Sequence, residues 1–162
     1  MSLIIVGDPH FGKGSSIAKP NHGDIHSRDK DKFELLKWIC KKANEEATKA
    51  KHIVITGDVF DEYSPGFLLI KLLFAFINGQ RKDFVIHLIP GNHDLKRTGA
   101  NYLSVLDILN EFKLENVHIY NEITSVTIDD CFVTFLPFRD IRWLNAKSND
   151  QAVKILKDKL AK

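Results

Sequence analysis

The fold of this chain can be predicted from the stretch Ile53-Val54-Ile55-Thr56-Gly57-Asp58-Val59-Phe60-Asp61-Glu62. Its first four residues form an apolar run typical of a strand, and two carboxylates follow where that strand ends. Two other polar clusters also come directly after apolar runs: Asp8-Pro9-His10 and Gly91-Asn92-His93-Asp94. The carboxyl ends of parallel strands share one rim of an open α/β sheet, so we expect the three clusters to meet there.

Size and composition favour one globular domain over residues 1–162. The chain is 44% hydrophobic and 27% charged, which is enough apolar material for a core. No apolar run approaches the ~20 residues of a membrane span, so we expect a cytoplasmic protein without membrane contact. The net charge of +2 is too small to argue for nucleic-acid binding by itself. Cys40 and Cys131 are interpreted as packed thiols.

The order of patterns predicts an α/β fold with a mixed β-sheet flanked by helices. Residues 3–7 are predicted to form the central strand, and residues 11–30 a loop over the rim. An amphipathic helix is expected over residues 31–51, a second helix over 67–77 capped at Ser64-Pro65, a strand over 84–89 and a helix over 100–112. Short strands are expected at 117–120, 125–128 and 132–136, the last two joined as a hairpin at Asp129-Asp130, and a surface helix at 150–160.

The three clusters combine carboxylate, imidazole and amide donors. Such mixed sets suit Mn, Fe or Zn better than Ca. Two ions ~3.5 to 4 Å apart generate a hydroxide nucleophile and neutralise a phosphate, so the expected substrate is a phosphoester.

The motifs Asp8-x-His10, Gly57-Asp58-x-x-Asp61 and Gly91-Asn92-His93-Asp94, in this order, resemble the first three motifs of the calcineurin-like metallophosphoesterases. The resemblance implies two divalent metal ions, with manganese expected and magnesium, iron or zinc as alternatives. It also implies a four-layer αββα sandwich, which would be incomplete in a chain of this length.

Further residues resemble the SbcD-type DNA repair exonucleases and their bacteriophage recombination relatives. They are Asp8-Pro9-His10-Phe11-Gly12, Phe60-Asp61 with Pro65, Arg28, and Phe135-Leu136-Pro137-Phe138-Arg139. This resemblance implies a DNA exo- or endonuclease of recombination and repair, with DNA and an SbcC-like ATPase subunit as partners and a homodimer as a further candidate assembly. Serine/threonine phosphatases usually carry Gly-Asn-His-Glu and an arginine after the second aspartate, where this chain has Asp94 and Glu62.

By the family resemblance, Asp8 and His10 would bind the first ion, Asp58 would bridge both ions, and Asn92 would bind the second. His93 would act as general acid, oriented by Asp61. Asp94 is expected to support these groups from behind. The remaining candidates, as substrate contacts, are His22, His26 and Arg28, although both histidines are more simply interpreted as solvated loop residues.

The chain departs from the family pattern after these motifs. The family completes its site with a later lone histidine and a Gly-His-x-His motif, whereas this sequence has no histidine after His118. It therefore supplies four ligands where the family uses seven, and we interpret it as the amino-terminal part of a longer nuclease that binds metal weakly alone. A non-catalytic scaffold of the same fold and a small phosphodiesterase or phosphatase remain alternatives.

Overall fold

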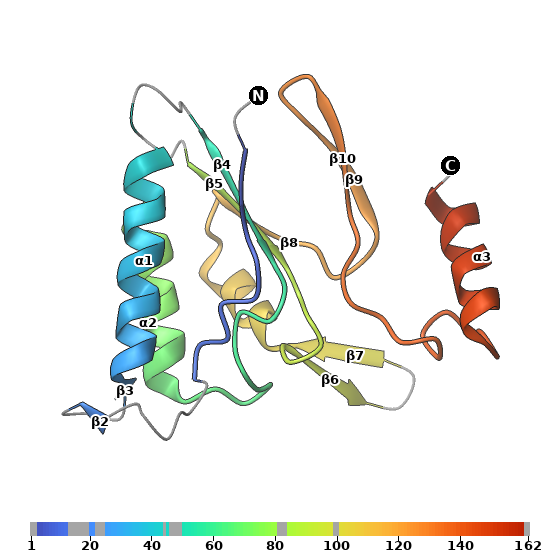
Figure 1. Cartoon of the computed structure of the whole chain (residues 1–162), viewed down its shortest axis with the longest axis horizontal. Helices are drawn as coiled ribbons and strands as arrows, with labels where there is room; N and C mark the ends of the chain where they lie inside the picture. The colour runs from blue at the N-terminus through green and yellow to red at the C-terminus, as the bar shows by residue number, and fades with distance from the viewer. Residues whose placement is uncertain are drawn as a thin grey trace.

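The computed structural model describes residues 3–12, 20–21, 25–43, 45, 50–80, 84–98 and 101–160. Their elements lie in four layers (Figure 1). Helices α1 (Ser27–Ala43) and α2 (Phe67–Asn78) cover one face of a central sheet. A β-hairpin lies on the other side of the sheet, and α3 (Asn149–Leu160) is outermost. The α/β class is thus confirmed, with the layers in the order helix, sheet, sheet, helix.

The central sheet has four strands, all parallel: β1 (Leu3–Val6), β4 (His52–Thr56), β5 (Val85–Ile89) and β8 (Val117–Ile119), in the order β1-β4-β5-β8. The prediction that residues 3–7 form the central strand is wrong for the described part of the chain. There β1 is an edge strand, because the strands that follow it are all added on one side. Ile5 is accordingly 65% exposed.

The main core lies between the helices and the sheet. It is formed by one face of each helix, where apolar residues recur every three or four positions. The buried members are Phe33, Leu36, Cys40 and Ala43 of α1 and Leu69, Leu73, Phe76 and Ile77 of α2, packed against Ile53, Ile55, Ile86 and Leu88 of the sheet. α2 begins where predicted, but its N-cap is Gly66 and no side chain caps it.

The boundaries predicted for α1 are wrong at both ends. The helix begins at Ser27 because the short hairpin β2 (Pro20–Asn21) and β3 (Ile25–His26) leads directly into it. It ends at Ala43, and Ala50 N–H donates to the Ala43 carbonyl as the chain turns toward β4.

The helix predicted over residues 100–112 is also incorrect in its first part. The chain there forms a hairpin of β6 (Leu95–Thr98) and β7 (Asn101–Ser104), followed by the 3₁₀ helix η1 (Val105–Phe112). Ser104 starts η1 because its hydroxyl accepts the Leu106 N–H while Asp107 accepts the Ser104 N–H. This reciprocal capping fixes the helix start at Val105.

The antiparallel hairpin β9 (Thr124–Ile128) and β10 (Cys131–Phe135) forms where predicted, turning at Asp129-Asp130. It makes a sheet of its own and does not extend the parallel one, so the predicted mixed sheet is two sheets. A second core joins them and contains Val54, Tyr120, Ile128 and Phe135. Beyond it, α3 packs through Ala152 onto Leu144 and Ala146, as expected of a surface helix.

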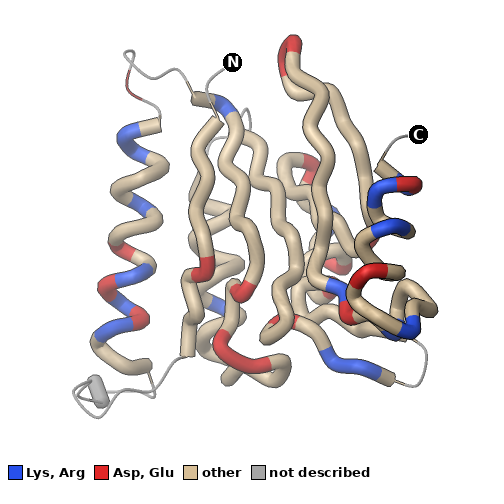
Figure 2. Tube along the Cα trace, turned by 45° about the vertical axis from the view of Figure 1, so that its right-hand side comes forward, with Lys and Arg blue, Asp and Glu red and all other residues tan. Residues whose placement is uncertain are grey.

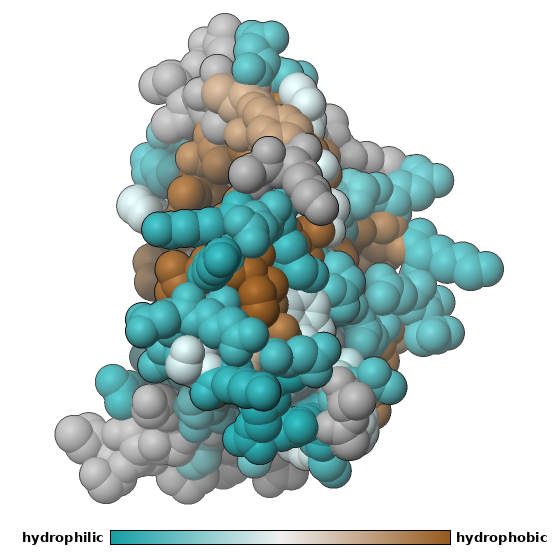
Figure 3. All heavy atoms as spheres, turned by 90° about the vertical axis from the view of Figure 1, so that its right-hand side faces the viewer, coloured by the Kyte–Doolittle hydropathy of each residue, from teal (hydrophilic) through white to brown (hydrophobic). Residues whose placement is uncertain are grey.

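Apolar surface remains exposed on the face that carries the hairpin and α3 (Figure 3). No helix in the described ranges is both long and apolar enough to span a membrane.

Candidate metal centre

The three polar clusters follow β1, β4 and β5, which are neighbours in the sheet. The loops after β1 and β4 continue side by side beyond the sheet. His10 N–H donates to the Asp58 carbonyl (2.8 Å) and Phe11 N–H donates to the Val59 carbonyl (2.9 Å). In the other direction, Asp61 N–H donates to the Phe11 carbonyl (2.9 Å). These bonds fix the backbone that carries His10, Asp58 and Asp61. Acidic positions lie on the loops at this end of the sheet (Figure 2).

Three of the residues at this rim have left-handed backbone conformations. Their φ angles are 41° for Asp8, 47° for His10 and 44° for Asp58. Such conformations cost of order 1–3 kcal/mol each in residues other than glycine and cluster at functional sites. The hydrogen bonds of His10 and Asp58 hold two of these residues in conformations that a relaxed backbone would not adopt.

Gly91 allows the loop after β5 to approach Asp58 closely. A Cβ atom at position 91 would lie 2.1 Å from Asp58 Oδ1, so no other residue fits there. The same carboxylate oxygen accepts the His93 N–H at 3.0 Å. Asp58 is thus fixed between two loops, with its second oxygen 3.6 Å from His10 Nε2.

Asp94 holds the loops after β4 and β5 together from the protein interior. Its carboxylate is fully buried and accepts three backbone N–H groups, from Val59 (3.1 Å), Phe60 (2.9 Å) and Gly91 (2.9 Å). Burial raises the pKa of Asp94 above its usual value, although the three hydrogen bonds oppose that shift. Asp94 therefore links the backbones of the two loops, and its supporting role in a metal site stays a prediction.

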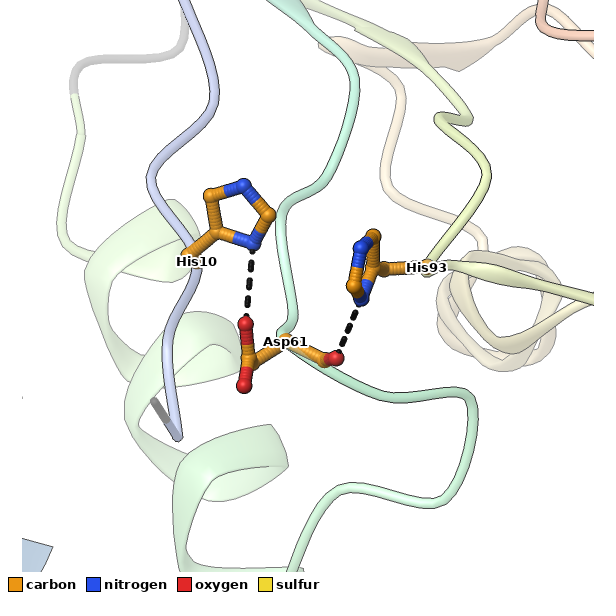
Figure 4. A group of neighbouring side chains, drawn as sticks. All are labelled: His10, Asp61 and His93. Atoms are coloured by element: carbon orange, nitrogen blue, oxygen red, sulfur yellow. Dashed lines mark hydrogen bonds and ion pairs between the residues drawn. The ribbon is translucent and has the colours of Figure 1, made fainter. Parts of the chain in front are cut away.

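His10, Asp61 and His93 form a cluster of side chains from the loops after β1, β4 and β5 (Figure 4). His10 Nδ1 lies 3.1 Å from Asp61 Oδ1, and the two histidine rings meet edge to face with centroids 5.0 Å apart. His93 Nδ1 lies 2.6 Å from the backbone carbonyl oxygen of Asp61. The expected pairing of His93 with Asp61 therefore occurs through the main chain, and the carboxylate is directed to His10.

Asp58 also lines a cavity of about 330 Å³. Asp8, Asp58 and Asn92 line it, together with Thr56, Gly57 and Gly91. Its remaining wall is apolar and consists of Ile89, Pro90, Leu136 and Phe138. The four residues predicted as ligands are therefore divided between this cavity and the cluster, with Asp58 at the boundary; their role as ligands stays a prediction.

The side chains present fit a divalent cation. One ligand atom from each of His10, Asp61 and His93 lies within 4.8 Å of the others. His10 Nδ1 is buried and makes no hydrogen bond among the described residues, since its contact with Asp61 lacks hydrogen-bond geometry. A buried nitrogen without a donor or acceptor partner is costly unless another group satisfies it, and a metal ion would do so.

The proposed substrate contacts are less well placed. His22 lies outside the described residues. Arg28 is exposed in the first turn of α1, and His26 is half-buried with an unpartnered Nδ1 among the residues described. No contact joins either residue to the metal-site residues in the described part of the chain.

Sequence reasoning missed two supporting residues, Asp29 and Lys32, which lie on the first turns of α1. Asp29 is 1% exposed and accepts the Gly12 N–H at 2.8 Å. The Lys32 ammonium lies 3.6 Å from Asp29 and donates to the His10 carbonyl, and burial lowers its pKa. The helical pattern gave no sign of this role, because both residues occur in a run of alternating charges.

The chain matches the calcineurin-like phosphoesterase family over residues 1–159. With the matched region covering nearly the whole sequence, the chain belongs to this family, whose members are usually metal-dependent hydrolases. A comparison with curated proteins found no significant match.

Proposed function

We propose that this protein hydrolyses phosphodiester bonds in DNA with the help of two divalent ions. The observation that carries the proposal is the arrangement around Asp58, which lies 3.6 Å from His10 of the His10, Asp61 and His93 cluster and lines the cavity together with Asp8 and Asn92. What favours DNA over a small ester is the resemblance of residues 8–12, 60–65 and 135–139 to the SbcD-type nucleases.

The site residues would have separate roles in hydrolysis. Asp8, His10, Asp58 and Asn92 would hold the ions, which supply a Lewis acid and an activated water when bound. His93 would protonate the leaving oxygen through Nε2, because Nδ1 is engaged by the Asp61 carbonyl. That contact keeps one proton on Nδ1 and the ring in one orientation, so the proton donated through Nε2 would come from the doubly protonated imidazolium form.

Manganese is the proposed native metal, since oxygen and imidazole donors both suit it. An SbcC-like ATPase is the proposed partner on the same resemblance.

The test is a manganese titration by calorimetry together with digestion of single- and double-stranded DNA. Asp58 lies at the centre of the arrangement, so Asp58→Ala should abolish cleavage and reduce metal binding. Asp130→Ala, an exposed position in the β9–β10 turn, is the matched control. Cleavage that survives in Asp58→Ala would show that the nuclease activity does not come from this site.

A non-catalytic scaffold is the second candidate. It is favoured by the division of the predicted ligands, because His10 belongs to the cluster with Asp61 and His93 whereas Asp8 and Asn92 line the cavity. A scaffold would bind no metal in the titration and cleave neither DNA nor bis(p-nitrophenyl) phosphate. A small phosphodiesterase would cleave only the latter.

A further inference from the structure

A second cavity, of about 240 Å³, lies beside the candidate metal centre. Its walls come from the segment after β10, the following turn and α3, and include Leu136, Phe138, Arg139, Trp143, Leu144 and Leu156. Of these residues, Leu144 is buried, with 9% of its surface exposed. The lining is apolar except for one cation, Arg139. Ligand pockets are typically of this kind, mostly apolar with few polar groups.

The two cavities share a wall. Leu136 and Phe138 line both the second cavity and the cavity that contains Asp8, Asp58 and Asn92. The wall is attached to the loop after β5, because Phe138 N–H donates to the Pro90 carbonyl at 3.1 Å. Both side chains are nonetheless substantially exposed, Leu136 by 46% and Phe138 by 44%. A ligand seated at the metal centre would therefore meet an apolar and aromatic edge next to it.

Arg139 is a fixed and nearly buried cation at this second cavity. Its side chain is 6% exposed and donates to the carbonyls of Phe138 and Asn121. Its guanidinium carbon lies 5.4 Å from the centre of the Tyr102 ring and 5.1 Å from that of Trp143. Nε is buried and has no hydrogen-bond partner among the residues that the structure describes. Because Arg139 lines the cavity, it presents a positive charge there, which the Glu122 carboxylate 3.8 Å away balances in part.

These features describe a ligand with two parts. One part is anionic and belongs at the metal centre, and the other is flat, mostly apolar and rich in hydrogen-bond acceptors. A nucleobase has the second set of properties and binds aromatic side chains through its face. Small-molecule sites usually enclose ~300–1,000 Å³. The cavity of about 240 Å³ is below this range and the cavity of about 330 Å³ is at its lower end, so the pair is better suited to a whole nucleotide.

We propose that the cavity lined by Phe138, Arg139 and Leu156 receives the nucleobase of the nucleotide whose phosphate lies at the metal centre. This inference rests on the proposed function and deepens it, since it predicts that the site distinguishes nucleotides from other phosphoesters. It also gives the exposed apolar wall a role that the hydrolysis itself does not require.

The test uses the fluorescence of Trp143, which lines the cavity. The only other tryptophan is Trp38 on α1, so Trp38→Phe leaves a single reporter. Thymidine 5′-monophosphate and deoxyribose 5-phosphate are titrated with manganese present; the second carries the same phosphate without the base. The nucleotide should change the Trp143 emission saturably and bind about tenfold more tightly.

The second measurement compares ligand affinities in a variant whose larger side chain fills the cavity. Leu156→Phe should weaken binding of the nucleotide at least fivefold while leaving that of deoxyribose 5-phosphate within about twofold. Val153→Phe is the matched control, because Val153 is 50% exposed on the same helix and does not line the cavity. It should leave both affinities unchanged.

Equal binding of the two ligands to the protein with Leu156 intact would overturn the proposal, and so would equal effects of Leu156→Phe and Val153→Phe. The first comparison needs no cavity variant, so a Leu156→Phe protein that fails to fold does not prevent the test. Failure of the proposed function is observed separately, as absence of manganese-dependent hydrolysis of DNA and of bis(p-nitrophenyl) phosphate. Base-dependent binding without hydrolysis would support the proposed nucleobase cavity and contradict the proposed nuclease activity.

Discussion

His93 Nδ1 contacts the main-chain carbonyl of Asp61, 2.6 Å away, and the Asp61 carboxylate lies against His10 instead. The side chain and the main chain of one residue thus contact two different histidines. Asp61→Ala should therefore leave the tautomer of His93 unchanged while it weakens metal binding by about tenfold, through the loss of a negative charge 3.1 Å from His10. NMR of the ring nitrogens and a manganese titration check the two parts. A change in the His93 tautomer would mean that the carboxylate, and not the carbonyl, sets it.

His93→Asn should slow hydrolysis while metal affinity stays within about threefold. The physical reason is that His93 is assigned as proton donor, and removing a general acid costs ~10²–10⁴-fold in rate. Calorimetry and the turnover of bis(p-nitrophenyl) phosphate are measured on the same preparation. Equal loss of binding and rate would instead make His93 a ligand, which its 4.8 Å grouping with His10 and Asp61 also permits.

Asp94→Ala should destabilise the fold by about 2–4 kcal/mol, because three buried N–H groups lose their acceptor and each unsatisfied group costs ~1–3 kcal/mol. The burial that raises the pKa of this carboxyl offsets part of the loss. Urea unfolding followed by circular dichroism gives the free energy. Asp130→Ala, whose side chain is exposed, should change it by less than about 0.5 kcal/mol. A similar effect of both substitutions would contradict the role of Asp94 as a link between loops.

The buried side chain of His87 should make the free energy of unfolding depend on pH. It is 3% exposed, with Nε2 3.1 Å from His52 Nδ1 and Nδ1 2.8 Å from the Tyr120 hydroxyl, and the ring stacks with Phe135 of β10. Burial, aided by His52 and His118, lowers its pKa from 6.5 to about 4.

The unfolded chain therefore binds this proton more readily than the folded one. The stability that depends on neutral His87 is complete above pH 6.5, declines as the pH falls from 6.5 to about 4, and declines no further below that. The expected loss is on the order of 3 kcal/mol. Urea unfolding at pH 7 and pH 4.5 measures it, and His87→Gln, which cannot titrate, should show a smaller difference. An unchanged difference in that variant would assign the acid sensitivity to other groups.

The two cysteines should react at very different rates. Burial raises the pKa of Cys40 to about 11, whereas Cys131 is exposed on β10. Because the thiolate is the reactive form, an aromatic disulfide reagent at pH 8 should modify Cys131 about 100-fold faster than Cys40. Cys131→Ser should remove the fast phase, and a fast phase that persists would show that α1 opens readily.

Much of the fold could be predicted because strand and helix periodicity report local structure. The strands ending at Val6, Thr56 and Ile89 and helix α2 follow directly from apolar patterns. The failures share one cause, which is that tertiary contacts decided the outcome. The position of β1 depends on where later strands are added, and the hairpin at residues 95–104 depends on pairing between Arg97 and Tyr102 that no local pattern indicates.

The candidate site could likewise be predicted only in part from the sequence. Neighbouring strands bring Asp8, Asp58 and Asn92 to one cavity, as expected from their places at strand ends. Which atoms meet could not be predicted, because Asp61 offers both a carboxylate and a carbonyl. Asp29 was missed for a related reason: its partner, Gly12 N–H, is 17 residues away.

The left-handed conformations of Asp8, His10 and Asp58 lower the stability of the fold at positions that the proposed activity requires. Glycine adopts positive φ without a steric penalty, so a glycine at any of these positions would relieve part of the cost that the present side chain carries. A search for thermostable variants alone would therefore favour loss of the very groups proposed to hold the ions. Selection for melting temperature, without an activity screen, would lead this protein toward a more stable and inactive form.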